Sequence, residues 1–244
     1  MEGAALYALG ALCGLLALMR VFASQVYDVL VVRMTSKWYK AVLARLPEGA
    51  VVLDVGIGTG TALLRNAASV EGKRLRVVGV DYDAGYVRSC AAAAERAGLR
   101  GSVEVHCKSI FDADLGAVVR KGLAKDALFD AAYFSGSWTL MPTPAEALRV
   151  AAALVKPEGK VYVTQTFQRA YSPVMGVVKP LLKYLTTIDF GNLHYTTDLE
   201  RYVREAAQPK GGWALRLEED STVPGSIDNS MQVAKLLVFK RVKA

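Results

Sequence analysis

The chain has 244 residues, 52% of them hydrophobic, and a formal net charge of +7. A chain of this size and composition can bury the core of one full domain, which excludes an intrinsically disordered protein. The three cysteines are odd in number and form no C-x-x-C pair or Cys/His cluster, so neither a disulfide framework nor a zinc site is expected. Nothing in the sequence calls for a metal.

Residues 3–19 carry no charged side chain, are rich in leucine and alanine, and are followed by Arg20. As a helix this run would span roughly 25 Å, a little less than a bilayer core, and tilting with extension to residue 23 would complete a span. Residues 1–23 are therefore interpreted as a separate segment and a candidate membrane anchor. The alternative is an apolar helix packed on the domain or on a partner. A secretory signal peptide is disfavoured because Glu2 is the only charged residue before the run.

The basic residues nearest this segment all follow it: Arg20, Arg33, Lys37 and Lys40. The positive-inside rule then predicts that residues 24–244 lie on the cytosolic side of a membrane, with a cytoplasmic protein as the alternative. The net positive charge also suits an anionic lipid surface. Nucleic acid is not expected as a partner, because no arginine-rich run or aromatic–basic platform is present.

Residues 24–46 repeat apolar side chains at helical spacing, which predicts one or two amphipathic helices. Residues 51–55, apolar apart from Asp54, predict a short buried strand. Three glycines follow at alternate positions: Gly56, Gly58 and Gly60. A helical pattern begins at residue 62, and the start of that helix would offer free N–H groups to a ligand. Strand, glycine turn and helix form the nucleotide-binding half of a βαβ unit.

Residues 76–80 predict a second buried strand, which is followed by Asp81. Asp81 lies 21 residues after Gly60, close to the spacing at which an acid at the tip of the second strand reaches ribose hydroxyls. The glycines read G-x-G-x-G, and Thr61 stands where a dinucleotide fingerprint has its last glycine. This spacing favours adenosine without a pyrophosphate, and an NAD enzyme is the weaker alternative.

The sequence DVGIGTG at residues 54–60 resembles the first motif of the class I S-adenosylmethionine-dependent methyltransferases, and VVGVD at 77–81 resembles the second. The approach to the fifth strand, at residues 149–159, is also similar, although Glu158 replaces a common glycine. The resemblance covers roughly residues 46–242. It implies an α/β fold with a Rossmann-like, doubly wound, seven-stranded sheet, mostly parallel with an antiparallel C-terminal strand, plus N-terminal helices. Residues 24–244 would form this methyltransferase domain.

The remaining predicted elements follow the order of that fold. Helices are predicted over residues 83–97, 144–155 and 198–207, and a capping box at 197–200 is expected to begin the last of them. Strands are predicted over residues 102–107, 129–134, 161–165, 213–219 and 231–240. Residues 156–160 are expected to form a turn. The irregular stretch 168–194 contains the region in which this family inserts its substrate-recognition segment.

The resemblance implies S-adenosyl-L-methionine as the cofactor. It carries the binding role over to Asp54, Gly56, Gly58, Gly60, Asp81, Tyr82, Ser109, Ile110 and Ser135. In this family the acid at Asp81 holds the ribose, and the side chain at Tyr82 lies along the adenine. Ser109 and Ile110 stand where the family holds the adenine edge. Ser135 follows the fourth strand, at the sheet edge where open α/β folds bind ligands.

Other residues are candidates for the acceptor pocket and for proton transfer. Tyr27, Trp38 and Tyr39 are pocket candidates by resemblance, because N-terminal helices often lie across the cofactor in this family; apolar packing is the favoured alternative. An oxygen or carbon acceptor needs a base. The candidates are His194, Asp189 and Tyr195. Histidine is the side chain best suited to proton transfer near neutral pH, and a surface or capping histidine is the alternative.

These features predict a methyltransferase that acts on a small, lipophilic acceptor such as a quinone, sterol, phenol or thiol. One alternative is a protein methyltransferase, which would need an open acidic groove. Another is a non-catalytic interaction protein that binds the cofactor, and the intact glycines and Asp81 disfavour it. The residues after the fourth strand are not of the Asn-Pro-Pro-Tyr type, which disfavours methylation of DNA bases.

Overall fold

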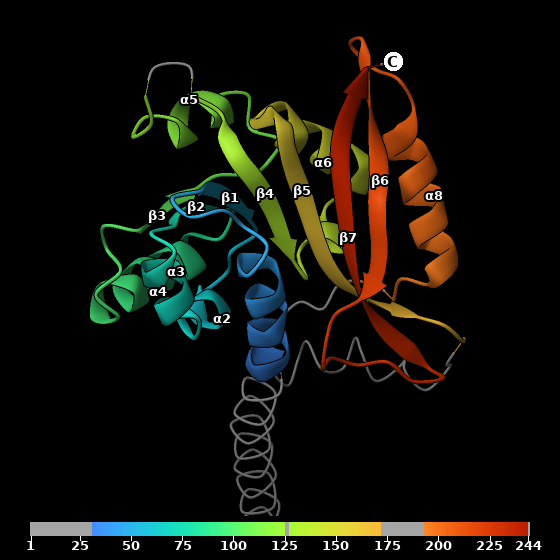
Figure 1. The fold of residues 1–244 in the computed structure, drawn as a ribbon, viewed down its shortest axis with the longest axis horizontal. Coiled ribbons are helices and arrows are strands. Elements are labelled where there is room, and N and C mark those ends of the chain that lie inside the picture. Colours follow the sequence, from blue (N-terminus) through green and yellow to red (C-terminus); the bar gives the residue numbers. More distant parts are fainter. Residues whose placement is uncertain (1–30, 125–126, 172–192, 244) are drawn as a thin grey trace, which may run out of the picture.

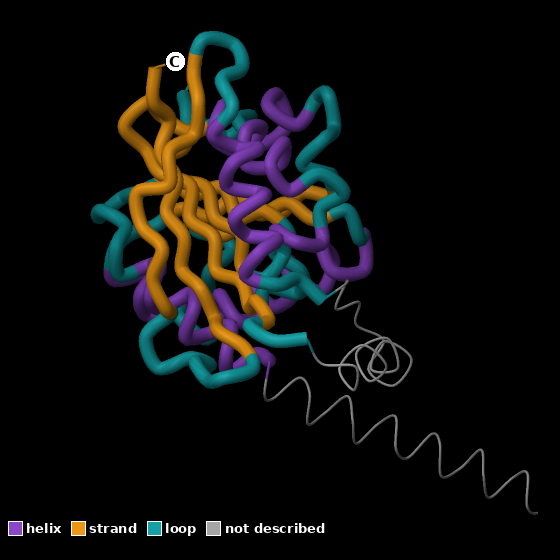
Figure 2. The backbone as a smooth tube through the Cα atoms, turned by 90° about the vertical axis from the view of Figure 1, so that its right-hand side faces the viewer, coloured by secondary structure: helices purple, strands orange, loops and turns teal. Residues whose placement is uncertain are grey.

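The computed structural model describes residues 31–124, 127–171 and 193–243. Residues 1–23, Tyr27 and Asp189 lie outside them. The described chain forms one twisted sheet with helices on both sides (Figure 1; Figure 2). Its helices include none that is long and apolar enough to cross a membrane.

Seven strands of the described chain lie in the order β3-β2-β1-β4-β5-β7-β6. They are β1 (Val51–Val55), β2 (Arg76–Asp81), β3 (Val103–Cys107), β4 (Phe129–Ser135), β5 (Val155–Gln168), β6 (Trp213–Thr222) and β7 (Gln232–Lys243). The first five pair in parallel, whereas β7 runs antiparallel to both of its neighbours, β5 and β6. The predicted sheet, mostly parallel with an antiparallel C-terminal strand, is confirmed.

The helices of the described chain begin with one over residues 31–43, here called the 31–43 helix. The others are α2 (Thr61–Leu64), α3 (Ala67–Gly72), α4 (Ala84–Arg96), α5 (Leu115–Val119), the 3-10 turn η1 (Trp138–Leu140), α6 (Pro144–Ala153) and α8 (Thr196–Ala207). Asp83 caps α4 as predicted, because its carboxylate accepts from the N–H groups of Gly85 at 2.7 Å and Tyr86 at 3.0 Å.

Both faces of the sheet are buried, which explains why β1 is an almost continuous apolar run. Val52 faces a core that contains the buried residues of the 31–43 helix and α2 to α4. Leu53, the next residue, faces a second core shared with α5, α6 and α8. The sheet therefore separates two layers of helices, as a doubly wound fold requires.

The 31–43 helix is held on the domain by side chains from other elements. Trp38 is 2% exposed, and its indole N–H donates to the Ser226 hydroxyl at 2.8 Å. The Lys73 ammonium donates to the carbonyl oxygens of Leu43 at 3.0 Å and Ala44 at 2.7 Å, which satisfies carbonyls at the C-terminal end of the helix. The predicted amphipathic helix is thus confirmed from residue 31 onward.

Local predictions were wrong in three places. The helix expected after the glycine turn is split into α2 and α3, because Asn66 turns its amide to the Ser36 carbonyl oxygen at 3.0 Å and so ties the break to the 31–43 helix. The predicted capping box at 197–200 is displaced: α8 begins at Thr196, and Asp198 accepts from the Tyr195 N–H at 2.9 Å. The predicted turn at 156–160 belongs to β5, which has a register shift against β4 there.

Candidate active site

The site lies at the carboxyl ends of the parallel strands, at the lower end of the sheet in Figure 1. From β1 the chain moves outward to β2 and β3, and it then crosses back to β4 on the other side of β1. The strand order therefore reverses between β1 and β4. Doubly wound sheets bind their ligands in the crevice outside such a reversal.

The glycine turn after β1 needs glycine for two different reasons. All three glycines have positive φ, with 73° at Gly56, 59° at Gly58 and 67° at Gly60. A Cβ atom at Gly56 would clash with the Ser137 side chain, and one at Gly60 would clash with the Cys90 sulfur. A Cβ at Gly58 would meet nothing within 4 Å. Two glycines thus allow tight packing, and Gly58 borders open space.

The side chain of Asp81, at the end of β2, fixes the glycine turn in place. Its Oδ2 accepts from the Gly58 N–H at 2.9 Å, and its Oδ1 accepts from the Asp83 N–H at 3.0 Å. Burial raises the pKa of Asp81, and the two backbone hydrogen bonds oppose that shift. Each carboxylate oxygen has a further lone pair, so Asp81 can still accept from a pair of ribose hydroxyls.

Asp54 is buried beneath the glycine turn, with 1% of its surface exposed. The Tyr39 hydroxyl donates to its Oδ2 at 2.7 Å, while its Oδ1 has no partner among the described residues. Burial raises the Asp54 pKa to about 7; the hydrogen bond from Tyr39 lowers it, and the charge of Asp81 raises it. A buried carboxylate oxygen without a donor is where a cationic or N–H group of a ligand would be stabilised.

The helix that follows the glycine turn is short. Its first segment, α2, has only four residues, from Thr61 to Leu64. The aligned peptide dipoles of a long helix are therefore missing at the turn, although the N–H groups at the start of α2 still face it. The acidic side chains at the turn are the carboxylates of Asp54 and Asp81.

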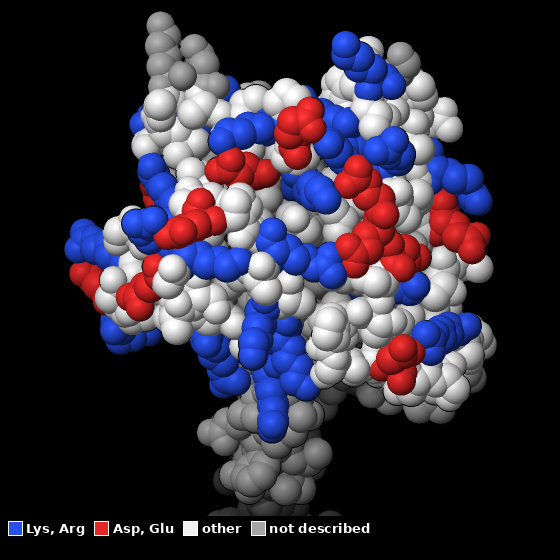
Figure 3. All heavy atoms as spheres, in the orientation of Figure 1, with Lys and Arg blue, Asp and Glu red and all other residues white. Residues whose placement is uncertain are grey.

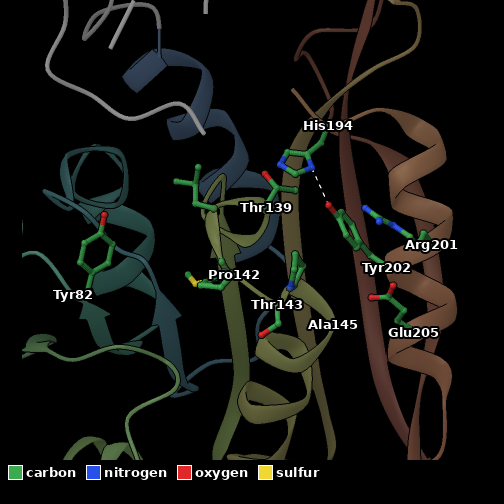
Figure 4. A pocket seen from close by; sticks show the side chains of 12 residues that line it. Tyr82, Thr139, Pro142, Thr143, Ala145, His194, Arg201, Tyr202 and Glu205 are labelled. Carbon is green, nitrogen blue, oxygen red and sulfur yellow. Dashed lines mark hydrogen bonds between the residues drawn. The ribbon is translucent and has the colours of Figure 1, made fainter. Parts of the chain in front are cut away.

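A pocket of about 560 Å³ opens beside these residues and extends from β2 to α8. Its lining consists of Tyr82, residues 139–145, His194, Arg201, Tyr202 and Glu205 (Figure 4). Tyr82 is 78% exposed, so its ring is available to a flat ligand. The segment 139–145 supplies mostly apolar surface, including Leu140, Met141 and Pro142.

His194 and Tyr202 meet in the wall of this pocket, where the His194 Nδ1 lies 3.0 Å from the Tyr202 hydroxyl (Figure 4). The rings lie 5.9 Å apart, centroid to centroid. The Arg201 guanidinium also lies over the Tyr202 ring, 5.0 Å from its centroid. Of the two base candidates within the described residues, His194 lines the pocket and Tyr195 does not.

The other predicted site residues lie in several different environments. Tyr195 precedes α8 and is not part of the pocket lining. Ser135 ends β4, and its hydroxyl is shielded from solvent. The Ser109 hydroxyl accepts from the Phe111 N–H at 3.2 Å. Ile110 is 2% exposed and packs in the core shared with α5, so only its backbone remains for an adenine edge.

Sequence reasoning missed two partners of the site, Tyr39 for Asp54 and Tyr202 for His194. Tyr39 was a pocket candidate with apolar packing as the favoured alternative, and packing holds for its ring, which is 3% exposed and lies edge-to-face with the Tyr133 ring, 5.0 Å between centroids. Its hydroxyl nevertheless reaches the site. Tyr202 lies on α8, a helix that was predicted, but no signal in the sequence singles out its hydroxyl.

Comparisons with known proteins agree with this geometry. Residues 52–159 match the family model described as "Methyltransferase domain". No curated protein matches the chain. One similar solved structure is a SAM-dependent methyltransferase from Geobacter sulfurreducens in complex with S-adenosyl-L-homocysteine, at 13% identity and a TM-score of 0.54, covering 85% of this chain and 90% of that one.

Two further solved structures are similar at low identity. The mitomycin 7-O-methyltransferase MmcR is 13% identical with a TM-score of 0.57, and the match covers 85% of this chain and 53% of that chain. The [4+2]-cyclase SpnF is 19% identical with a TM-score of 0.59, covering 87% of this chain and 82% of that one. The chain therefore spans about half of the length of the mitomycin enzyme.

Residues 52–159 carry the match to a methyltransferase domain, and the strand order is the fold of the similar S-adenosylmethionine-dependent methyltransferase structure. The residues present fit S-adenosyl-L-methionine as a cofactor. The partnerless Oδ1 of Asp54 suits the amino group of its methionine part. The open space at Gly58 and the anchored carboxylate of Asp81 suit its ribose.

Proposed function

We propose that this methyltransferase acts on a small, lipophilic acceptor, which binds in the pocket between Tyr82 and α8. The pocket volume of about 560 Å³ is typical of a site for small molecules, and the segment 139–145 gives it an apolar wall. This apolar wall beside the cofactor site is the observation that carries the proposal. One of the similar structures, the mitomycin enzyme, is by name an O-methyltransferase of a small molecule.

The cofactor supplies an already activated methyl group, so the main task of the chain is to align the acceptor. In this proposal Leu140 and Met141 exclude water and orient the acceptor along its apolar part. His194 takes a proton from an acceptor hydroxyl. The mechanism uses the tautomer in which the Nδ1–H donates to the Tyr202 hydroxyl, because the imidazole then carries its basic lone pair on Nε2. Tyr202 then fixes the orientation of the ring.

The test is a screen of purified quinones, sterols, phenols and thiols with cofactor labelled in its methyl group. Transfer of label to a lipophilic compound is expected, and labelling only of proteins in a mixed extract would favour the protein methyltransferase instead. With the acceptor in hand, His194→Gln should lower kcat by about 10²–10⁴ if His194 is the base. Tyr202→Phe should lower kcat less, since it removes the orienting bond and keeps the imidazole.

We also propose that the protein associates with a membrane through residues 3–23. This rests on the sequence of that segment and on the exposed basic residues Arg33, Lys37 and Lys40 that follow it. In Figure 3 lysine and arginine side chains gather over the 31–43 helix, whereas acidic and basic side chains alternate elsewhere on that face. A membrane surface would also bring the enzyme to lipophilic acceptors.

Membrane association is tested by expressing the chain with and without residues 2–23 and separating membranes after a salt wash. The full chain should remain with the membranes, and the shortened chain should be released. Retention of the shortened chain would rule out the segment as the anchor.

A further inference from the structure

The hydrogen bond between Tyr39 and Asp54 connects the 31–43 helix to the strand that leads into the glycine turn. Asp54 belongs to β1, and Tyr39 belongs to the 31–43 helix, which lies outside residues 52–159. Both side chains are buried, with 3% of Tyr39 and 1% of Asp54 exposed. The Tyr39 hydroxyl is the only donor to Asp54 among the described side chains.

Among the described residues, none of the titratable groups coupled to Asp54 carries a positive charge that could neutralise it. The titratable groups coupled to it are Tyr39 on the 31–43 helix, Tyr133 on β4, Cys90 on α4 and Asp81 on β2. All four are neutral or negative near neutral pH, and burial raises the pKa values of Tyr39 and Cys90, so neither forms an additional anion there. The phenol of Tyr39 is therefore the one described group that stabilises the carboxylate by a hydrogen bond.

We propose that Tyr39 is a positioning residue for the cofactor: its hydroxyl holds Oδ2 of Asp54 and leaves Oδ1 for the cofactor's amino group. Docking of the 31–43 helix and binding of the cofactor are thereby coupled, because the helix supplies the donor that the cofactor-binding carboxylate needs. The inference rests on the use of Asp54 in cofactor binding.

The proposal has a consequence for pH dependence that a purely structural role of Tyr39 lacks. An ionised Asp54 binds an amino group, so affinity is full above the Asp54 pKa and falls as the pH drops through it. The pKa of Asp54 in the free protein is about 7, and the Tyr39 bond lowers it. Removing the hydroxyl should move the midpoint to higher pH, because a buried carboxyl without its donor is harder to ionise.

The experiment measures the Kd of S-adenosyl-L-homocysteine by calorimetry with the full chain between pH 5.5 and 9. A shift of the midpoint by about one pH unit in Tyr39→Phe should weaken binding roughly fivefold at pH 7 and close to tenfold at pH 5.5, and the deficit should shrink as the pH rises above 8. Tyr133→Phe is the matched control: it also removes a buried phenol hydroxyl, which is bonded to Thr164 at 2.7 Å. Its midpoint should stay at the wild-type value.

Two further variants separate positioning from folding. In Asp54→Asn the plot of Kd against pH should no longer show the titration of this carboxyl. Adding Tyr39→Phe to Asp54→Asn should then cause no further pH-dependent loss of affinity. The amino group of the ligand titrates identically with every variant, so differences between profiles belong to the protein. Thermal unfolding without ligand checks that each variant is folded.

Three results would overturn the inference. A Tyr39→Phe profile that overlays the wild type would remove the role of the hydroxyl. If Tyr39→Phe lowers the affinity by the same factor at every pH, Tyr39 is only a packing residue. The same conclusion follows if Tyr133→Phe shifts the midpoint equally. If the wild type binds no S-adenosyl-L-homocysteine at any pH, the cofactor assignment itself fails, which is distinct from a failure of the coupling.

Discussion

The two ends of the site are built in different ways. The cofactor end is made by residues close to one another in sequence, since the glycine turn and Asp81 come from β1, β2 and the loops that follow them. The acceptor end joins Tyr82, the segment 139–145 and α8, which are far apart along the chain. The first depends on backbone conformation and backbone hydrogen bonds. The second depends on side chains that long-range packing brings together.

Because the cofactor end depends on backbone conformation, a side chain added to its glycine turn should cause the largest loss of stability and affinity. Gly56→Ala should weaken cofactor binding severely and destabilise the fold by roughly 2–5 kcal/mol, since the new Cβ clashes with Ser137 at a backbone φ of 73°. Gly98→Ala is the control, because Gly98 has the same φ of 73° but open space around it. It should cost only about 1–2 kcal/mol. Urea unfolding and S-adenosyl-L-homocysteine titration measure both; equal costs would mean that the clash is relieved.

The buried carboxylate at the cofactor end predicts a conflict between stability and binding. The pKa of Asp54 is raised to about 7 from its ordinary 3.8. The protonated Asp54 carboxyl therefore contributes fully to the free energy of unfolding below about pH 4. This contribution is lost as the pH rises towards 7, because the unfolded chain ionises the carboxyl more easily than the folded one. Asp54→Asn should remove this loss and make the ligand-free protein up to roughly 4 kcal/mol more stable at pH 8.

The measurement is urea unfolding of the ligand-free wild type and Asp54→Asn at pH 5 and pH 8. The same variant should bind S-adenosyl-L-homocysteine more weakly. Parallel stability curves for the two proteins across this pH range would contradict a raised pKa at Asp54.

The Asp81 carboxylate has two expected roles at the cofactor end: it anchors the glycine turn, and it accepts hydrogen bonds from the ribose. Asp81→Asn should weaken S-adenosyl-L-homocysteine binding by roughly 1.5–3 kcal/mol, since an amide N–H₂ would then face either a backbone N–H or a ribose hydroxyl. Asp130→Asn is the control, because Asp130 also accepts from a backbone N–H, that of Val51 at 2.8 Å, but at the opposite end of β1 from the glycine turn. Calorimetry should show near-normal affinity for the control, and a similar loss in both variants would argue against a ribose role for Asp81.

The smallest effect is expected where the 31–43 helix meets the C-terminal strands. Arg45, just beyond this helix, pairs with Glu219 on β6 through two contacts, and both side chains are 36% exposed. A double-mutant cycle with Arg45→Gln and Glu219→Gln should give a coupling of about 0.5–1 kcal/mol in urea unfolding, and less at high salt. A coupling that does not change with salt would show that the pair is shielded from solvent.

The contrast between local and long-range contacts also explains which features could be predicted from the sequence. The strand–turn–helix order, the Asp83 cap and the place of Asp81 at the end of the second strand follow from local patterns, and they were predicted. Tyr39 meets Asp54, and Asn66 meets Ser36, only after the 31–43 helix docks. The split between α2 and α3 could not be predicted because a tertiary contact at Asn66 stabilises it.

The acceptor end was the least predictable for a physical reason. His194 was identified because histidine is rare in this chain, but its partner Tyr202 is a helix residue with an ordinary apolar spacing. The periodicity that buries Tyr202 does not indicate where its hydroxyl points. Asp189 remains a prediction, since it lies outside the described residues.

The direction of β7 has a practical consequence for handling the enzyme. Because β7 runs opposite to the parallel strands, Lys243 lies at the end of the sheet away from the glycine turn, whereas the 31–43 helix lies at the same end as the site (Figure 1). A surface or a fluorescent protein attached after β7 would therefore stand at the far end of the sheet from the pocket. Immobilisation through that end should leave the pocket accessible to ligands in flow.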